Sequence, residues 1–343
     1  MDILEYLDEN YIPENLPFRE NQIRIIKEKI EKYSRGFNPS YLLIFGSSGL
    51  GKTASVKFVF KNLFIQNVRF VYINAFLYNT LNSLLVKIAE ELKLGINFKG
   101  YSNEEIINLI FGNLKNTNTK LVICIDEVDK IKDLNETLYI FARLESLLNF
   151  RPYLILISNT KDFILNLDQR VLSSLVFDEL EFKPYTIEQL KVIAEERIKP
   201  IFGNNYDKSV LTLIANECYN NGSDVRIILK ILRKAIEVLE ERGENRLSID
   251  IIKEVVKDFQ KKVPKIEIKN LEIKDERQKE ILEILKQKGR EYTSELFKII
   301  NQKYGIKKRM FNYLMKDLIN KGLIEIKREK GVRGSKFIAY LKV

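Results

Sequence analysis

The chain has 343 residues, of which 45% are hydrophobic and 30% are charged. At roughly 150 residues per domain, this length predicts two or three domains with sizeable cores. No run of about 18 apolar residues is present, and the chain opens with the acidic sequence Met1-Asp2-Ile3-Leu4-Glu5, so we expect neither a membrane span nor a secretory signal. There is no histidine, and the only cysteines are Cys124 and Cys218. This composition argues against His-based catalysis, a zinc site and a disulfide framework, and favours buried cysteines in a reducing cytoplasm.

The net charge of +10 is concentrated at one end of the chain. Residues 264–343 hold 21 of the 57 basic residues and 11 of the 47 acidic residues, so this segment alone accounts for the excess. A lysine-rich, heat-adapted composition would raise basic and acidic residues together, as residues 1–263 do with 36 of each. We therefore favour binding of a polyanion, above all nucleic acid, by the C-terminal segment.

The first half of the chain has the pattern of a parallel sheet. Four short apolar runs without alternation are Tyr41 to Phe45, Arg69 to Ile73, Leu121 to Ile125 and Tyr153 to Ile157. Segments of helical periodicity separate these runs, which is typical of strand–helix units that cover both faces of a sheet. The pattern predicts an α/β domain over residues 1–183.

The strand signals stop near Pro184. Helical patterns then open at Thr186, Ser223 and Ser248, and Thr186-x-x-Gln189 has the spacing of a capping box. We expect an all-helical domain at 184–262, followed by a charged linker at 263–276.

The C-terminal segment, 277–343, has a different order of elements. Its pattern predicts helices at about 277–288, 293–303 and 306–321, and then strands at Leu323 to Lys327 and Lys336 to Leu341. Three helices followed by a hairpin are the winged-helix version of a helix-turn-helix.

Gly46-Ser47-Ser48-Gly49-Leu50-Gly51-Lys52-Thr53 fits the phosphate-binding pattern G-x-x-x-x-G-K-[ST], between an apolar strand and an amphipathic helix. The glycines let backbone N–H groups turn toward phosphates without a clash from Cβ atoms. Lys52 is expected to reach the β- and γ-phosphates of ATP or ADP, and the Thr53 hydroxyl to ligate Mg²⁺. The expected nucleotide contacts are Gly46, Ser48, Gly49, Leu50, Gly51, Lys52, Thr53 and Ala54.

Polar residues end two of the other predicted strands. Asp126-Glu127 follows the apolar run that ends at Ile125, and Asn159 follows the next run. The carboxyl ends of parallel strands are where open α/β sheets bind ligands. We expect Asp126 to hold Mg²⁺ through water, Glu127 to polarise the attacking water, and Asn159 to contact the γ-phosphate or that water. Taken alone, Asn159 fits a simple turn equally well.

Two arginines are further candidates. Arg170 follows an amphipathic stretch and is a candidate for stabilising the transition state of a neighbouring subunit, although a solvated arginine is the simpler interpretation. Arg226 is predicted in the first turn of a helix, where the helix dipole disfavours a cation. An outside anion such as the γ-phosphate of ATP would explain its position.

This ordered set of motifs resembles that of AAA+ ATPases and, more narrowly, of archaeal replication initiators related to the origin recognition complex and its cell-division-cycle loader partner. The similarity rests on Tyr11-Ile12-Pro13-x-x-Leu16-Pro17-x-Arg19, Asp126-Glu127-Val128-Asp129, Leu167-Asp168-Gln169-Arg170-Val171-x-Ser173-Ser174-Leu175 and Phe182-x-Pro184-Tyr185-Thr186-x-x-Gln189-Leu190. The resemblance implies nucleotide contacts by Arg19, Tyr185 and Arg197, an arginine finger at Arg170, a second sensor at Arg226, and DNA contacts by an insertion between about Ala75 and Phe111. The chain departs from the family at three positions. It has Phe18 where the family often has histidine, Gln169 where it often has proline, and Ser223 where it often has glycine.

The predicted helix at 306–321 has the pattern of a DNA-reading helix. Phe311, Leu314, Met315 and Leu318 form one apolar face. The opposite side offers cations for phosphates and groups that read base edges, and the wing offers long cations suited to a minor groove or its phosphates. The expected DNA contacts are Lys308, Arg309, Asn312, Tyr313, Lys316, Lys327, Arg328, Lys330, Arg333 and Lys336.

Taken with these features, the resemblance implies an ATP-dependent DNA replication initiator that binds origin duplex and helps recruit the replicative MCM helicase, with slow hydrolysis as a switch. Other initiator paralogues on the same DNA are expected partners, and the expected location is the cytoplasm, at the nucleoid. Two alternatives stay open: a DNA-binding transcriptional regulator or antagonistic paralogue, and a hexameric motor, for which no convincing pore loop is present.

Overall fold

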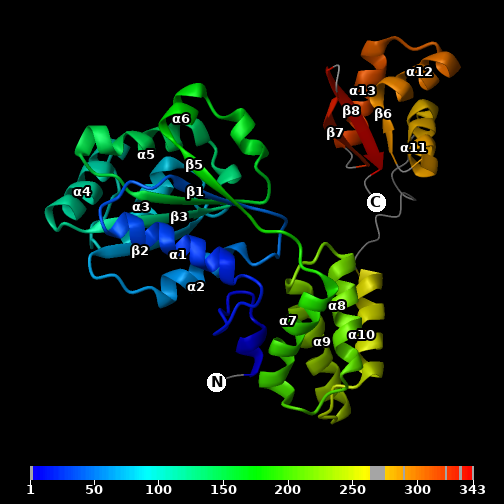
Figure 1. The fold of residues 1–343 in the computed structure, drawn as a ribbon, viewed down its shortest axis with the longest axis horizontal. Coiled ribbons are helices and arrows are strands. Elements are labelled where there is room, and N and C mark those ends of the chain that lie inside the picture. Colours follow the sequence, from blue (N-terminus) through cyan, green and yellow to red (C-terminus); the bar gives the residue numbers. More distant parts are fainter. Residues whose placement is uncertain (1–2, 263–274, 289, 321–322, 332–333, 342–343) are drawn as a thin grey trace. The chain divides into compact units, whose positions relative to one another are not determined.

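A computed structural model of the protein describes residues 3–262, 275–288, 290–320, 323–331 and 334–341. The chain divides into two units, Met1–Phe259 and Gln260–Val343 (Figure 1). Each unit has its own hydrophobic core. The first unit holds both the predicted α/β domain and the predicted helical domain. Residues 263–274, most of the predicted linker, lie outside the described residues.

A five-stranded parallel sheet lies at the centre of the first unit, with the strand order β2-β3-β4-β1-β5. Its strands are β1 (Tyr41–Phe45), β2 (Val68–Asn74), β3 (Lys120–Asp126), β4 (Tyr153–Ser158) and β5 (Phe177–Glu181). The first four are the predicted strands, and β1, β3 and β4 are almost fully buried, as a sheet covered on both faces requires. The sequence analysis missed β5 because this edge strand, Phe-Asp-Glu-Leu-Glu, is mostly acidic and exposed.

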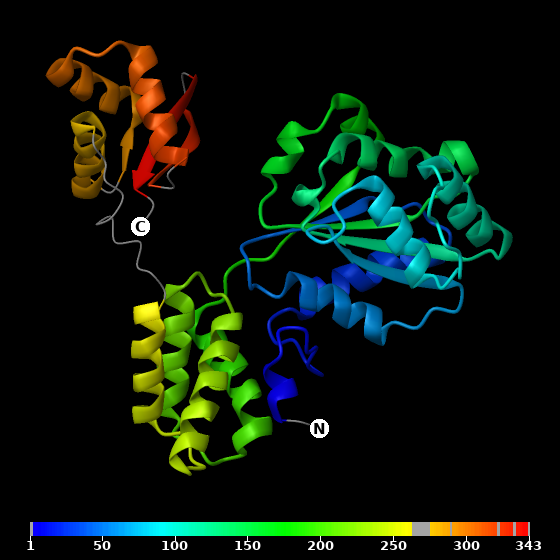
Figure 2. The same ribbon diagram turned by 180° about the vertical axis from the view of Figure 1, so that it is seen from behind.

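Helices cover both faces of the sheet (Figures 1 and 2). On one face α1 contacts α2, and on the other α3 contacts α4 while α5 contacts α6. The connection from β1 to β2 crosses the sheet in one direction, and the connections from β2 to β3, β3 to β4 and β4 to β5 cross it in the other. Because all such connections are right-handed, the helices of the first lie on one face and the helices of the others lie on the opposite face. The helices and 3₁₀ turns are η1 (Ile3–Leu7), α1 (Glu20–Ser34), α2 (Lys52–Asn62), α3 (Leu81–Glu91), α4 (Asn103–Asn116), η2 (Val128–Lys130), α5 (Leu134–Leu148), η3 (Asp162–Asn166) and α6 (Gln169–Ser174).

A bundle of four helices completes the first unit. It consists of α7 (Ile187–Phe202), α8 (Ser209–Asn220), α9 (Arg226–Arg242) and α10 (Ile249–Lys262). The predicted capping box at the start of α7 is confirmed: the Gln189 N–H donates to Thr186 Oγ1 at 3.3 Å, and the Thr186 N–H donates to Gln189 Oε1 at 3.0 Å. Because η1 contacts both α7 and α9, the N-terminal segment is attached to this bundle.

The second unit has the element order of a winged helix. It consists of α11 (Glu276–Lys288), β6 (Arg290–Tyr292), α12 (Thr293–Tyr304), α13 (Lys308–Asn320), β7 (Ile324–Gly331) and β8 (Gly334–Leu341). The strands form an antiparallel sheet in the order β6-β8-β7. The hairpin is longer than predicted, and β6 was missed because three residues are too few to show alternation.

Both cysteines are free and buried, Cys124 in β3 and Cys218 in α8, which confirms that they serve as small core residues. Within the part of the chain that the structure describes, every helix is too short or too polar to cross a bilayer.

Candidate functional site

The loop between β1 and α2 is built on glycines in conformations that other residues rarely adopt. Gly46, Gly49 and Gly51 have φ angles of 143°, 72° and 85°. A side chain on Gly46 would also strike the backbone of Phe182. Because α2 begins directly after Gly51, the unpaired N–H groups of its first turn face the loop and favour an anion there.

Lys52 joins this loop to the end of β4. Its Nζ donates hydrogen bonds to the carbonyl oxygens of Gly46 at 2.6 Å and Ser47 at 2.8 Å, and to Asn159 Oδ1 at 3.0 Å. Burial lowers the pKa of Lys52 to about 8, since a charged ammonium loses hydration there. The sheet thus brings together two predicted site residues that are far apart in the sequence.

Asp126, at the end of β3, accepts hydrogen bonds on both carboxylate oxygens. Thr53 Oγ1 donates to Oδ2 at 2.5 Å, and the Glu127 N–H donates to Oδ1 at 2.9 Å. Glu127 itself has a left-handed backbone with a φ of 53°, a conformation that costs a non-glycine residue roughly 1–2 kcal/mol. Such a strained backbone persists only where the surrounding structure holds it in place, and strained residues cluster at functional sites.

The donor set at this point fits a magnesium–nucleotide complex. The Thr53 hydroxyl and the Asp126 carboxylate meet directly, and both supply the hard oxygen ligands that Mg²⁺ prefers. Across the described residues, no group of three or more His, Cys, Asp or Glu side chains is placed to hold a metal by itself. Mg²⁺ at nucleotide sites typically relies on one or two carboxylates plus substrate phosphates, so these residues suit a metal that arrives with the nucleotide.

The helical bundle places Arg226 at the phosphate loop. Its Nη2 donates to Ser48 Oγ at 2.8 Å, and its Nε donates to Asp224 Oδ1 at 2.9 Å. The hydrogen bond with Asp224 raises the pKa of Arg226. Asp224, two residues away, thus supplies a negative charge beside this guanidinium, so the position of Arg226 does not by itself require an outside anion. Its contact with a γ-phosphate stays a prediction.

The segment before α9 also contacts the loop through its backbone. Ser223 has a φ of 62°, a left-handed conformation that glycine adopts more readily than other residues. Its Oγ donates to the Tyr185 carbonyl at 2.9 Å, and the Val225 N–H donates to the Gly49 carbonyl at 3.1 Å. These contacts fix the helical bundle against the phosphate loop.

Replacing Gly49 by alanine should weaken ATP binding at least tenfold. A Cβ at this position would overlap the Asp224 carboxylate, and the positive φ adds backbone strain. Nucleotide titration of the variant, with thermal unfolding to verify its fold, measures the effect. Gly112→Ala is the matched control, since Gly112 lies in α4 with nothing near its missing side chain; equal ATP affinity in both variants would contradict the prediction.

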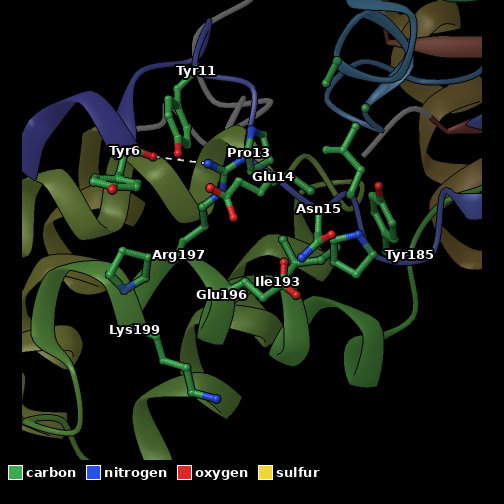
Figure 3. Close-up of a pocket in the computed structure, with 16 residues that line it drawn as sticks. Tyr6, Tyr11, Pro13, Glu14, Asn15, Tyr185, Ile193, Glu196, Arg197 and Lys199 are labelled. Atoms are coloured by element: carbon green, nitrogen blue, oxygen red, sulfur yellow. Dashed lines mark hydrogen bonds between the residues drawn. The ribbon is translucent and has the colours of Figure 1, made fainter. Parts of the chain in front are cut away.

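Two adjoining cavities extend from this loop. One, of about 430 Å³, lies between the N-terminal segment and α7, and Tyr11, Tyr185 and Arg197 are on its wall (Figure 3). The other, of about 300 Å³, is lined by the loop together with Asp126, Glu127, Asn159 and Arg226. The residues that line both are Tyr11, Gly51, Ala54, Arg197 and Val225. One molecule with an apolar ring system and a chain of phosphates would fit this pair of cavities.

Arg197 holds the N-terminal segment in place. Its Nη1 donates to the Tyr6 carbonyl at 3.3 Å, drawn as a dashed line in Figure 3, and its guanidinium lies 5.7 Å from the ring centroid of Tyr11. The side chain of Arg197 is half-buried beside the cavity, and this burial lowers its pKa.

Arg19 has a different position from the one expected. Its side chain is buried, its Nε donates to the Leu50 carbonyl at 3.0 Å, and its guanidinium lies 3.7 Å from the ring centroid of Tyr185. Arg19, Leu50 and Gly46 line neither cavity. Arg19 therefore supports Tyr185 and the phosphate loop from behind, where carbonyl oxygens satisfy its donors.

Arg170 lies apart from both cavities. Its side chain is 77% exposed and pairs with Asp168 at 3.5 Å. A role toward a neighbouring subunit stays a prediction.

Several residues on the cavity wall were missed by the sequence analysis. They include Asp8, Glu9, Asn10, Lys57, Tyr72, Asn74 and Leu229. Tyr72 and Asn74 belong to β2, which reaches the site only because β2 pairs with β3. The order of strands is a tertiary property, so the local sequence carried no signal for them.

In the second unit, α13 has the predicted two-sided character. Phe311, Leu314, Met315 and Leu318 are buried in the core. Lys308, Arg309, Asn312, Tyr313 and Lys316 are all exposed. Arg333 lies outside the described residues, as do the side chains of Lys327, Arg328, Lys330 and Lys336. The predicted reading face is therefore accessible on α13.

Removing two cations from this face should weaken duplex binding and flatten its salt dependence. Arg309→Ala with Lys316→Ala removes two exposed charges, so the slope of log affinity against log salt should fall by about two. Lys253→Ala with Lys279→Ala removes the same charge from α10 and α11 and should leave the slope nearly unchanged. Titration of labelled duplex at several salt concentrations measures both, and equal slopes would mean that α13 faces away from DNA.

Comparison with known proteins identifies the family. A family described as "AAA domain" matches residues 35–165. The ORC1-type DNA replication protein 1 of Methanothermobacter thermautotrophicus is 32% identical over 269 residues, which are 74% of this chain and 69% of that relative. This chain belongs to the ORC1-type DNA replication proteins. The resemblance drawn from the motifs is therefore confirmed.

Two solved structures have the same fold as this chain. The Aeropyrum pernix ORC1 protein in complex with DNA is 25% identical, with a TM-score of 0.66 and coverage of 99% of this chain and 93% of that chain. The Aeropyrum pernix ORC2 protein, solved with ADPNP and ADP, has a TM-score of 0.74 at 21% identity, covering 98% and 93%. This ORC1-type chain spans just under two thirds of the length of two further curated relatives, 65% and 62%.

Proposed function

We propose that this ORC1-type protein is an ATP-dependent replication initiator that binds origin duplex DNA, with slow ATP hydrolysis as its switch. One observation carries the proposal. Lys52, Thr53, Asp126, Glu127 and Arg226, from the sheet and from the helical bundle, line a single cavity that adjoins a second cavity of nucleoside size. Membership of an AAA family, whose members are ATPases, supports the same conclusion.

The proposed roles follow from the hydrogen-bonding geometry. Lys52 would neutralise the β- and γ-phosphates, and Thr53 with Asp126 would hold Mg²⁺, which stabilises the charge that develops on the phosphates. Glu127 is the candidate base for the attacking water, since it lies next to Asp126 on the cavity wall. Asn159, already bonded to Lys52, would contact the γ-phosphate or that water, and Tyr185 with Arg197 would contact the nucleoside.

A switch is supported by the contacts between the helical bundle and the phosphate loop. Arg226 bonds to Ser48, and the Val225 N–H bonds to the Gly49 carbonyl. Cleavage of the γ-phosphate would remove a negative charge beside Arg226, and with it an attraction that holds the bundle to the loop. Hydrolysis would thereby change the angle of the bundle and the affinity for partners.

DNA binding by the second unit is supported by its charge and by its exposed α13 face. The net charge of +10 comes entirely from residues 264–343, and a relative of the same fold is solved in complex with DNA. The insertion between about Ala75 and Phe111, which includes α3, is a second proposed DNA contact. The proposed partners are the MCM helicase and other initiator paralogues at the same origin.

Genome-wide occupancy tests this function against a role at promoters. The protein should concentrate at mapped start points of replication, and purified protein should bind duplex from those sites more tightly with ATP than with ADP. Occupancy confined to promoters would favour a transcriptional regulator. Failure to bind adenine nucleotide at all would overturn the proposal.

A further inference from the structure

The Asp126 carboxylate has a third hydrogen-bond partner, from β2. The Tyr72 hydroxyl donates to Asp126 Oδ2 at 2.8 Å, and this is the same oxygen that accepts the Thr53 hydroxyl. Since the Glu127 N–H occupies Oδ1, the carboxylate is held from three directions. Tyr72 and Lys57 line the cavity beside these residues.

The three donors leave the carboxylate little freedom to rotate. A side chain that ligates a metal works best when its orientation is fixed before the metal arrives, and partners of ligating carboxylates commonly provide this. Thr53 cannot do so alone, because in the proposed function its hydroxyl must itself turn to the metal. Tyr72 has no such second task.

We propose that Tyr72 is a positioning residue that orients Asp126 for the magnesium–nucleotide complex. This inference rests on the proposed function, because it concerns the metal that ATP would bring. Tyr72 lies in β2, the strand next to β3, and its backbone pairs with that of Cys124. The rigid ring carries the hydroxyl from β2 to the Asp126 carboxylate.

Lys57 completes the arrangement. Its Nζ lies 4.4 Å from the centroid of the Tyr72 ring, close enough for a cation–π interaction. The positive charge over the ring draws electron density from the phenol and strengthens the hydroxyl as a donor. Lys57 lies in α2, four residues after Thr53, so the helix that carries one candidate ligand also supports the residue that orients the other.

The test separates metal dependence from nucleotide affinity. Tyr72→Phe keeps the ring and removes only the hydroxyl. Binding of a fluorescent ATP analogue is titrated in EDTA and over a series of MgCl₂ concentrations. In EDTA the variant should match the wild type within about twofold, while the Mg²⁺ concentration for half-maximal enhancement should rise about tenfold, as for other partners of metal ligands. Lys57→Met should produce a smaller rise in the same direction.

Tyr153→Phe is the matched control. The Tyr153 hydroxyl donates to the Ser40 carbonyl at 3.2 Å, and this contact lies outside both cavities, so its loss should not move the Mg²⁺ dependence. An unchanged Mg²⁺ dependence in Tyr72→Phe, or an equal loss of affinity in EDTA, would overturn the inference while leaving the proposed function standing. A wild type that binds no ATP under either condition would overturn both.

Discussion

Replacing Glu127 by glutamine should leave ATP binding intact and lower ATP hydrolysis at least a hundredfold. Glutamine has the same shape but cannot accept a proton from water, and a general base contributes typically 10²–10⁴ in rate. The residues proposed to hold the nucleotide, Lys52, Thr53 and Asp126, keep their hydrogen bonds. Because the Glu127 N–H, and not its side chain, bonds to Asp126, the substitution does not release the Asp126 carboxylate.

Single-turnover release of labelled phosphate measures the rate, and equilibrium titration measures the affinity. Glu136→Gln is the control, because Glu136 is an exposed residue in the first turn of α5 and loses the same charge. Hydrolysis at the wild-type rate by the Glu127 variant would remove this residue from the mechanism. A parallel loss of ATP binding would assign it to the nucleotide contact instead.

Deletion of residues 264–343 should abolish sequence-preferred duplex binding while ATP binding stays within about twofold of the full chain. This segment carries the entire net charge of +10, and the electrostatic part of DNA affinity depends on the phosphates that such charges neutralise. The unit Met1–Phe259 has its own core and contains both cavities. We therefore expect the truncated protein to fold and to keep its nucleotide site.

Footprinting and titration of labelled duplex compare the truncated and full chains, with thermal unfolding in the presence of ATP to verify that the first unit is intact. The double variant of Arg309 and Lys316 serves as an intermediate, since it removes charge from α13 without removing the unit. An unchanged footprint after truncation would contradict the prediction and would place DNA recognition in the first unit, with the insertion that includes α3 as the first candidate.

Much of the fold could be predicted because its signals are local. The runs that form β1, β3 and β4 are apolar without alternation, and the capping box of α7 needs only Thr186 and Gln189. The apolar stripe of α13 is visible in the sequence because four apolar residues recur at helical spacing. All four are buried in the structure. Elements without such signals were missed: β5 is an acidic edge strand and β6 has three residues.

Within the site, too, residues with a local sequence signal were predicted and residues without one were missed. The phosphate loop and Asp126-Glu127 stand out because their chemistry requires particular residues at fixed spacing, next to a strand. Tyr72 and Asp224 have no such spacing, since one reaches the site through strand order and the other through contact between the helical bundle and Gly49. Arg19 shows the opposite error: its motif suggested a nucleotide contact, but its guanidinium is buried against the Leu50 carbonyl and the Tyr185 ring.

The kind of chemistry follows from local sequence, because a phosphate loop, a pair of acids after a strand and a basic C-terminal segment are properties of neighbouring residues and of composition. The tertiary structure sets which side chains surround each charge. It gave Arg226 the internal partner Asp224 and gave Asp126 the hydroxyl of Tyr72. The physical reason is that the strength of a hydrogen bond or an ion pair depends on distance and burial. Residues far apart in the chain come close together and become buried only when strands pair and helices pack.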